Sequence, residues 1–314
     1  MSGLPFAIAV APNGARRTRK DHPRLPMTAA EIARDAAEAR EAGAAMIHLH
    51  VRDSEGRHTL DVGLYREAVK AVHGAVGGDL VVQITTEAVG IYRPEEQIAV
   101  VDALRPESVS VALREILPPE SDEHEAASFF ARMEESGILH QIIVYEPGEL
   151  ARIDELARRG VLPDGPLAVL AVLGRYTEEG ATDAEFDAFM AAGIERHQWM
   201  LCAFGPRETE FMKRAAAGGG HARVGFENNL WLPDGDLAPS NASLVEAAAC
   251  DIDMSHRRVA TADDLRRLWR KPASASTRAS AAAEQPGRPD LRHGLSGQTS
   301  TSPQGNVQNK ETRS

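Results

Sequence analysis

The sequence predicts an α/β protein, a (β/α)8 barrel followed by a disordered tail. Eight short apolar or β-branched segments alternate with segments of helical periodicity, which favours a parallel sheet and no tight hairpin. Eight such repeats in a chain of 314 residues fit a TIM barrel better than a doubly wound sheet. The turn after the first expected strand, Pro12-Asn13-Gly14-Ala15, also lacks the glycine pattern of a dinucleotide-binding fold.

The strands are expected at the segments rich in valine, isoleucine and leucine, and the helices at the segments between them. The expected strands are Phe6–Ala11, Ala45–Val51, Leu80–Thr85, Ser108–Ala112, Gln141–Tyr145, Leu167–Leu173, Trp199–Ala203 and Ala222–Phe226. The expected helices are Thr28–Ala42, Leu64–Ala75, Pro94–Ala103, Glu123–Ser136, Gly148–Arg159, Asp183–Ala192, Glu208–Ala217 and Ala242–Ala248. The first helix has the clearest ends, because Thr28-Ala29-Ala30-Glu31 has the capping-box pattern and Gly43 follows its last turn.

The composition changes after Lys271. Residues 272–314 are mostly Ser, Ala, Thr, Pro, Gly and Gln, with few large aliphatic and no aromatic residues. Such a segment buries too little apolar surface to offset its ordering entropy, which predicts a disordered tail; a partner-binding tail is the alternative. The folded domain is therefore expected to span residues 1–271.

The remaining composition excludes several classes of protein. Hydrophobic residues make up 43% of the chain and the formal net charge is −11, which disfavours nucleic-acid binding. Two cysteines indicate a reducing compartment, and neither a membrane-spanning run nor a signal-peptide core is recognisable. We therefore expect a cytoplasmic protein without a membrane partner.

Two histidines at the second expected strand predict a metal site. His48 and His50 are two residues apart, so on a strand they share a face, with Ile47 and Leu49 on the other. Active sites of such barrels lie at the carboxyl ends of strands, where paired imidazoles suit a divalent metal. Two core histidines with satisfied hydrogen bonds are the alternative interpretation.

A third ligand is expected at the last strand. Alternation places Arg223, Gly225 and Glu227 on one face, and the last and second strands flank the first in a closed barrel. Glu227 then completes a His2Glu set with an open position, typical of catalytic zinc; manganese or iron also suits these donors. A solvated loop residue or a helix cap is the alternative for Glu227.

At these motifs the sequence resembles the β-keto acid cleavage enzymes, whose type member is 3-keto-5-aminohexanoate cleavage enzyme. The matching segments run in order along residues 4–270. They include Leu25-Pro26-Met27-Thr28, Ile47-His48-Leu49-His50-Val51-Arg52-Asp53, Gln83-Ile84-Thr85-Thr86, Val144-Tyr145-Glu146, Gly219-Gly220-His221-Ala222-Arg223-Val224-Gly225-Phe226-Glu227 and Ser240-Asn241-Ala242.

The resemblance implies a zinc-dependent acyltransferase that converts a β-keto acid and acetyl-CoA to acetoacetate and a new acyl-CoA. It implies that His48, His50 and Glu227 hold the metal, and that Arg223 and the Thr85 hydroxyl act at the substrate. It also implies a homo-oligomer, a tetramer in the pattern of the family.

The sequence departs from the family pattern around this metal site. Asn228 replaces the aspartate proposed as the family's base, and an amide cannot take a proton near neutral pH. Arg16 replaces an acidic residue of the first loop, and the segment at Ser110 replaces an Asn-x-Gly segment near the substrate. Ile143 occupies a position where the family pattern has an acidic residue. Glu146 matches the family pattern and is a candidate replacement base.

Cations around the barrel mouth suggest a substrate with an additional negative charge, such as a keto diacid. Arg16, Arg114, Arg175 and Arg223 are the candidates, and surface charges are the alternative. Gly205 and Arg207, at the start of the helix after the seventh strand, are candidates for contact with a CoA phosphate; a plain turn is the alternative. Cys202 is expected in the core.

Two other functions remain open from the sequence. The loss of the family aspartate makes a CoA-independent, metal-assisted hydrolase or lyase conceivable on the same site. A catalytically silent metal-binding or ligand-binding barrel is the other alternative.

Overall fold

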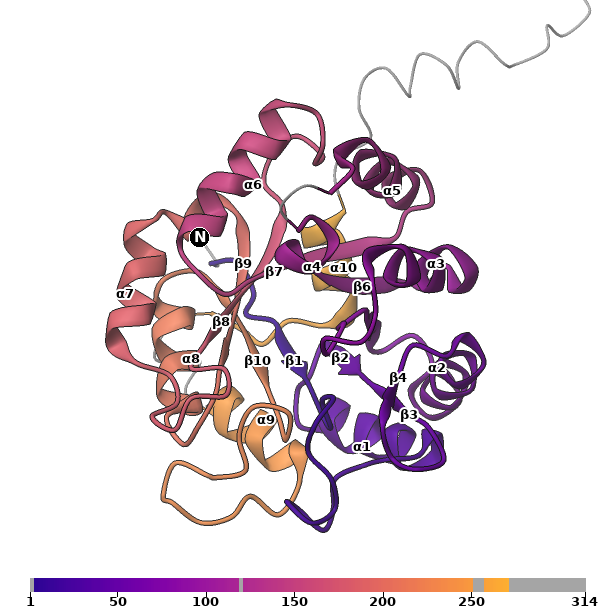
Figure 1. The fold of residues 1–314 in the computed structure, drawn as a ribbon. Coiled ribbons are helices and arrows are strands. Elements are labelled where there is room, and N and C mark those ends of the chain that lie inside the picture. Colours follow the sequence, from indigo (N-terminus) through magenta and orange to yellow (C-terminus); the bar gives the residue numbers. More distant parts are fainter. Residues whose placement is uncertain (1–2, 119–120, 251–256, 271–314) are drawn as a thin grey trace, which may run out of the picture. The chain divides into compact units, whose positions relative to one another are not determined.

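The computed structural model describes residues 3–118, 121–250 and 257–270, and these form a closed parallel barrel with helices around it (Figure 1). The eight expected strands are all confirmed. They are β1 (Ile8–Val10), β2 (Met46–Leu49), β5 (Val81–Thr85), β6 (Ser108–Ala112), β7 (Leu139–Val144), β8 (Ala168–Leu173), β9 (Gln198–Ala203) and β10 (His221–Val224). The expected tail lies outside the described residues, and the boundary at residue 271 stays a prediction.

The order of strands brings the two expected metal motifs together. Around the barrel the order is β1-β10-β9-β8-β7-β6-β5-β2, and β2 closes the ring on β1. Val10 of β1 pairs with Val224 of β10 on one side and with Ile47 of β2 on the other. The last and second strands therefore end on either side of the first, as the barrel hypothesis requires.

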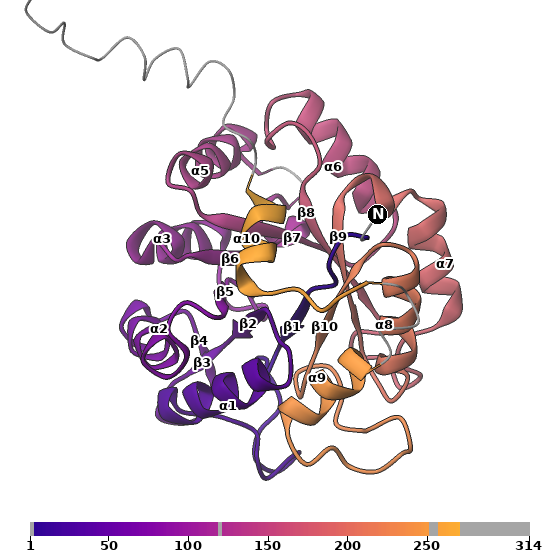
Figure 2. The ribbon, with the colours of Figure 1, turned by 180° about the vertical axis from the view of Figure 1, so that it is seen from behind.

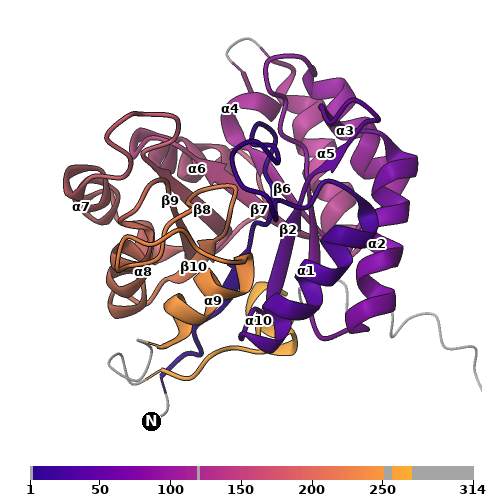
Figure 3. The same cartoon turned by 90° about the horizontal axis from the view of Figure 1, so that it is seen from below.

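The expected helices are confirmed within a few residues. They are α1 (Ala29–Glu41), α2 (Val62–Val76), α3 (Pro94–Leu104), α5 (Glu123–Glu135), α6 (Gly148–Arg158), α7 (Asp183–Ala191), α8 (Glu208–Ala217) and α9 (Asn241–Cys250). The capping box of α1 is present, since the Glu31 amide donates to the Thr28 hydroxyl and the Thr28 amide donates to the Glu31 carboxylate. Figure 3 shows α1 and α2 side by side along the flank of the barrel.

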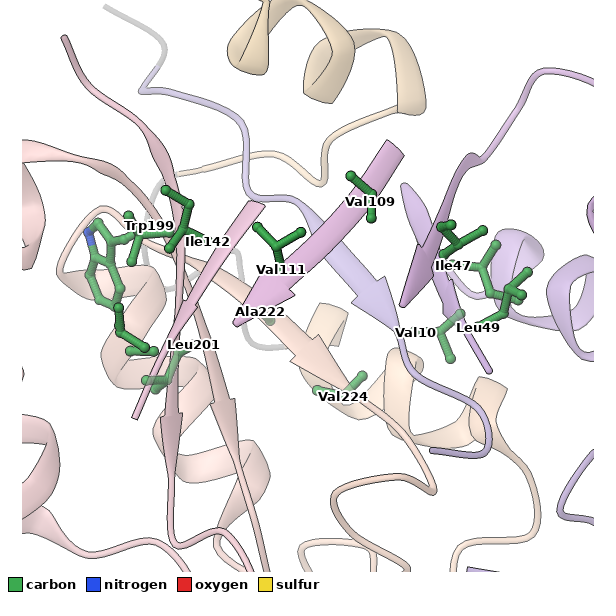
Figure 4. Packing of buried hydrophobic residues seen from close by; sticks show 14 of the residues in the cluster. Val10, Ile47, Leu49, Val109, Val111, Ile142, Trp199, Leu201, Ala222 and Val224 are labelled. Carbon is green, nitrogen blue, oxygen red and sulfur yellow. The ribbon is translucent and has the colours of Figure 1, made fainter. Parts of the chain in front are cut away.

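Side-chain alternation divides the core into two parts. Outward-facing residues such as Ile47, Leu49 and Val224 are buried against the helices, and Figure 4 shows such side chains on several strands. Inward-facing residues such as Met46 and Met200 fill the barrel itself. Helix α10 (Ala262–Trp269) adds Leu265 to this inner cluster. It lies across the end of the barrel where the strands begin (Figure 2).

A short hairpin after β2 is a correction to the expected fold. Strands β3 (Val51–Arg52) and β4 (His58–Thr59) pair antiparallel, so Val51 belongs to this ribbon and not to the second barrel strand. The Asn13 side chain explains the break, because it accepts from the His50 amide at 3.3 Å and donates to the His50 carbonyl at 2.9 Å. These bonds take the backbone groups that would otherwise extend the ladder.

Three shorter elements also lie outside the expected set. Helix α4 (Leu113–Ile116) and the 3-10 turn at Ile194–Arg196 have too few residues to produce a clear helical period, whereas α10 was missed although Thr261 and Asp264 form a capping box at its start. Among the described residues, none of the helices combines the length and apolarity needed to cross a membrane.

Candidate metal and substrate site

The predicted metal ligands converge at the carboxyl end of the barrel. The Nε2 atoms of His48 and His50 lie 3.1 Å apart, and each faces Oε2 of Glu227, at 3.7 and 3.5 Å. One donor atom from each residue lies within 4.8 Å of the other two. The two histidines are buried, and the Glu227 Oε2 atom is buried with no hydrogen-bond partner among the residues that the structure describes. Two nitrogens and an uncommitted carboxylate oxygen around one point fit a divalent metal ion.

Two glycines allow Glu227 to reach this point. Gly225 has a φ of +135°, and a Cβ there would lie 2.4 Å from the Ala11 carbonyl oxygen. Gly14 has a φ of +60°, and a Cβ there would lie 2.5 Å from Cγ of Glu227. The chain after β10 therefore passes close to the loop after β1, where the Glu227 amide donates to the Ala11 carbonyl at 3.1 Å. Both close approaches require glycine.

The electrostatics of the site keep the ligands in the forms that bind metal. Burial, followed by the positive charge of Arg223, lowers the pKa of His48 to about 3, so its imidazole is neutral at neutral pH. Burial by itself would raise the pKa of Glu227, but Arg223 and the two histidines outweigh it and hold that pKa well below its usual value. Glu227 is therefore a carboxylate.

Gln83 of β5 orients His48. Its Oε1 lies 2.8 Å from Nδ1 of His48, so Nδ1 carries the proton and Nε2 keeps its lone pair for the metal. The amide nitrogen of Gln83 is held in turn by contacts of 3.4 Å with the Ser108 hydroxyl and with Oε1 of Gln141.

We expect Gln83→Ala to weaken metal binding by roughly 10- to 100-fold, the usual effect of losing an outer hydrogen-bond partner of a ligand. The reason is that His48 would lose the acceptor that selects its tautomer. Competition against a chromophoric chelator measures the affinity of each variant for the metal. Gln198→Ala is the control, because Gln198 begins β9 and the predicted metal ligands lie at the carboxyl ends of the strands. Equal affinities of the two variants would contradict the assigned role of Gln83.

Arg223 is buried beside the metal ligands with part of its guanidinium free. Its NH2 atom donates to Oε1 of Glu227 at 3.2 Å and contacts Sγ of Cys202 at 3.4 Å. Its Nε and NH1 atoms have no hydrogen-bond partner among the described residues. A buried cation with unused donors offers a binding point for a carboxylate. Cys202 is in the core, as expected, and burial raises the pKa of its thiol to about 12, which disfavours a nucleophilic role.

A small cavity joins these residues at the barrel mouth. Its polar wall consists of His48, His50, Thr85, Glu87, Ser110, Glu115, Arg175, Arg223 and Glu227. Its other wall consists of Ala112, Ile143, Tyr145, Val172 and Phe204. Thr85 and Ser110 are therefore placed with the metal ligands; the Ser110 hydroxyl is buried without a partner, and the Thr85 hydroxyl accepts from the Glu87 amide at 3.0 Å.

The remaining predicted residues lie outside this cavity. Asn228, Gly205 and Arg16 line a neighbouring pocket that shares Glu227 and Phe204 with it. Glu146 is exposed on the outer rim, which leaves it away from the predicted metal. Arg207 lines neither pocket, because its guanidinium binds Asp183 and Glu210.

Glu208 is a buried carboxylate that the sequence analysis missed. It begins α8 and is 0% exposed, and its oxygens accept from the Gly225 amide at 3.3 Å and from the Asn228 and Asn229 side chains at 3.4 Å. It therefore holds the loop that carries Glu227. In the sequence it is one of several charged residues opening a helix, a position at which exposure is the ordinary expectation.

The ionisation of Glu208 should make stability depend on pH. Burial raises the pKa of Glu208 to about 8, above the ordinary value of 4.5. Its contribution to the free energy of unfolding is therefore full below pH 4.5 and is lost as the pH rises through about 8. We expect Glu208→Gln to gain stability relative to the wild type across this range, by about 1.4 kcal/mol per unit of pKa difference at most. Urea unfolding at several pH values measures this, with exposed Glu195→Gln as the control; a pH-independent difference would contradict it.

Glu87 and Tyr145 were also missed as residues that surround the predicted metal ligands, whereas Arg175 was among the cations expected at the barrel mouth. Oε2 of Glu87 lies 3.8 Å from Nδ1 of His50, and Oε1 is paired with Arg175. Arg175 lies against the rings of Tyr145 and Tyr176. These contacts join the loops after β5, β7 and β8, and only the position of Glu87 two residues beyond Thr85 was a signal in the sequence.

Comparison with known proteins identifies the family of this chain. A family model described as beta-keto acid cleavage enzyme matches residues 5–270. The chain belongs to this family. The 3-keto-5-aminohexanoate cleavage enzyme of Fusobacterium nucleatum is 30% identical over 267 residues, covering 83% of this chain and 96% of that protein.

Two further similarities extend the comparison. The 3-dehydrocarnitine:acetyl-CoA trimethylamine transferase of Rhizobium meliloti is 28% identical over 289 residues, covering 83% of this chain and 94% of that protein. The binary complex of ObcA with oxaloacetate has a similar fold, with a TM-score of 0.61 at 18% identity over 79% of this chain and 67% of that one. Membership of the family makes this β-keto acid cleavage protein an enzyme and leaves a silent binding barrel without support.

Proposed function

We propose that this family member converts a β-keto acid and acetyl-CoA to acetoacetate and a new acyl-CoA, on a zinc ion held by His48, His50 and Glu227. The observation that carries the proposal is the convergence of these three donors beside the unused guanidinium nitrogens of Arg223. The Rhizobium meliloti relative is named for a reaction with acetyl-CoA, which supports the same co-substrate here.

The protein residues divide the binding of the β-keto acid between them. A divalent ion at the His2Glu site supplies Lewis acidity to the keto oxygen as negative charge develops there. Arg223 binds the substrate carboxylate through Nε and NH1, and its bond to Glu227 keeps the guanidinium aligned. The hydroxyls of Thr85 and Ser110 provide hydrogen bonds to the reacting groups.

The apolar wall and the neighbouring pocket complete the proposed site. Ile143, Val172 and Phe204 exclude water from the cavity, which strengthens the electrostatic contacts inside it. Acetyl-CoA approaches through the pocket lined by Gly205 and Asn228, which shares Glu227 with the cavity. Arg207 is available to a CoA phosphate only by exchanging its bonds to Asp183 and Glu210.

Asn228 sets the proton chemistry of the site apart from the family pattern. Its Nδ2 donates to the Arg223 carbonyl at 3.1 Å and to Glu208 at 3.4 Å, so in our proposal it orients the loop and does not take a proton. The candidate carboxylates for proton transfer are Glu87, which lines the cavity, and Glu146, which stays an exposed alternative.

Mass spectrometry of reaction mixtures tests the function. Zinc-loaded protein is incubated with acetyl-CoA and a panel of β-keto acids, and new acyl-CoA together with acetoacetate is the expected result. Consumption of the keto acid without acetyl-CoA would instead indicate hydrolysis or lyase chemistry. Asn228→Asp in the same assay shows whether a carboxyl group at this position increases turnover. A homo-oligomer and a cytoplasmic location stay predictions.

A further inference from the structure

Five side chains form an alternating stack of arginines and tyrosines beside the metal cavity. The Arg16 guanidinium lies 3.9 Å from the ring centre of Tyr176, and that of Arg114 lies 3.7 Å from the ring centre of Tyr145. Arg175 lies between the two rings, at 4.7 and 4.6 Å. These five residues, which we name the arginine pocket, line a hollow of about 340 Å³. They come from the loops after β1, β6, β7 and β8, which brings three cations together.

The stacking leaves the arginines able to bind an anion. A guanidinium that lies on a ring uses its face, while its N–H groups point outward in its plane and remain suited to a carboxylate. Arg175 is paired with Glu87, whereas Arg16 and Arg114 have no ion pair with a carboxylate in the part of the chain that the structure describes. Rings beneath the cations therefore hold them in place without neutralising them.

Two glutamates, Glu146 and Glu185, also line the hollow and offset part of this charge. Glu185 accepts bonds from Thr182 and from the Gly174 amide, so its carboxylate is engaged at the start of α7. Glu146 is exposed, and its amide and that of Tyr145 both donate to Glu149, which directs the chain into α6. The hollow is thus lined by three arginines and two glutamates, of which Glu185 is engaged by hydrogen bonds at the start of α7.

The arginine pocket adjoins the metal cavity. Tyr145, Val172 and Arg175 line both spaces, so a group in the hollow is a short chain length from the metal ligands. The phosphates of CoA are separated from the thioester by the long pantetheine arm, and this separation argues against them as the occupant while the thioester reacts at the metal. A second acidic group on the β-keto acid itself fits the distance better.

We propose that the arginine pocket binds a distal carboxylate of the substrate, so that this enzyme acts on β-keto diacids. The proposal rests on the function proposed above and names its substrate class. The first carboxylate occupies the free nitrogens of Arg223, the carbon chain follows Ile143 and Val172, and the distal carboxylate meets Arg114 and Arg16.

Steady-state kinetics with matched substrates test the proposal. The zinc-loaded wild type, Arg114→Gln and Arg16→Gln are compared on a series of 3-oxo diacids and on 3-oxo monoacids of equal chain length. Arg34→Gln, an exposed arginine of α1, is the control, and Arg114→Lys tests rescue by charge. We expect KM for the diacids to rise roughly 10- to 100-fold in Arg114→Gln, the factor for losing a charge-assisted hydrogen bond, with partial rescue by lysine. KM for the monoacids should stay unchanged in both variants, and KM for acetyl-CoA should stay unchanged in Arg114→Gln, because Arg16 but not Arg114 also lines the pocket proposed for acetyl-CoA.

Two results would overturn the proposal. Unchanged diacid kinetics in both variants would show that the stacked arginines are structural, and a rise confined to KM for acetyl-CoA would assign the pocket to CoA. Calorimetry with adipate and hexanoate measures the binding of a diacid and a monoacid independently of turnover. If the wild type turns over no keto acid, the proposed function fails, whereas Arg114-dependent binding of adipate but not hexanoate still supports the arginine pocket. Equal binding of the two acids contradicts it.

Discussion

Glu227→Gln is expected to abolish metal binding and turnover together. The substitution keeps the shape of the side chain but removes the charge that faces Nε2 of both His48 and His50. Loss of even an outer partner of a ligand costs roughly 10- to 100-fold, so loss of this ligand should reduce metal affinity by more than about 100-fold. Turnover falls by at least the same factor, because the open coordination position is lost with the metal.

Metal content and thermal unfolding with and without added zinc measure this effect. A metal that binds only the folded state raises the unfolding temperature of the wild type, and this rise should be absent in Glu227→Gln. Exposed Glu195→Gln provides the matched control, and it should keep both the metal and the rise. A Glu227→Gln variant that retains stoichiometric zinc at wild-type affinity would show that the carboxylate is not a ligand.

Arg223→Ala is expected to reduce kcat/KM by about 100- to 1,000-fold, the range for losing a preorganised donor at a reacting oxyanion. Arg223 is 3% exposed, and its Nε and NH1 atoms have no hydrogen-bond partner in the described part of the chain, so its removal deletes the proposed carboxylate partner. It also leaves Glu227 buried without its cation, so the pKa of that carboxyl group rises. Zinc binding should persist, because all three predicted ligands are still present in this variant.

Chemical rescue distinguishes a role in binding from a structural role. Added guanidinium ion should restore part of the activity of Arg223→Ala, since the deleted group leaves a space of matching shape beside Glu227. Arg223→Lys should be intermediate, because it keeps the charge but loses the planar arrangement of donors. Full activity of Arg223→Ala would contradict the assignment of the carboxylate to Arg223, and loss of zinc without rescue would make it a positioning residue only.

The barrel and its metal ligands could be predicted because local patterns determine them. The alternation around His48 puts both imidazoles on one face whatever the rest of the chain does, and the strand order of a closed barrel then brings Glu227 to them. The hairpin after β2 could not be predicted, because it depends on the Asn13 side chain reaching the backbone of His50 from another loop.

The surroundings of the metal ligands depend on contacts between loops that are far apart in the sequence. Glu146 directly follows the fifth expected strand, yet its chain turns outward into α6, while Glu87 turns inward to Arg175. Glu208 has the local pattern of an exposed helix start, but the loop of Gly225 packs over it and its pKa rises to about 8. Such outcomes depend on burial, which is a property of the packed structure.

The sequence alone therefore determined the barrel, the face of each strand and the three residues predicted to hold a metal, because backbone periodicity and sterics act over a few residues. The tertiary structure decided how the surrounding charges are used. The sequence predicted Arg16, Arg114 and Arg175 around the barrel mouth, but only the meeting of the segments after β1, β6, β7 and β8 stacks them on Tyr145 and Tyr176. The physical reason is that loop side chains take their positions from long-range packing, which no local pattern encodes.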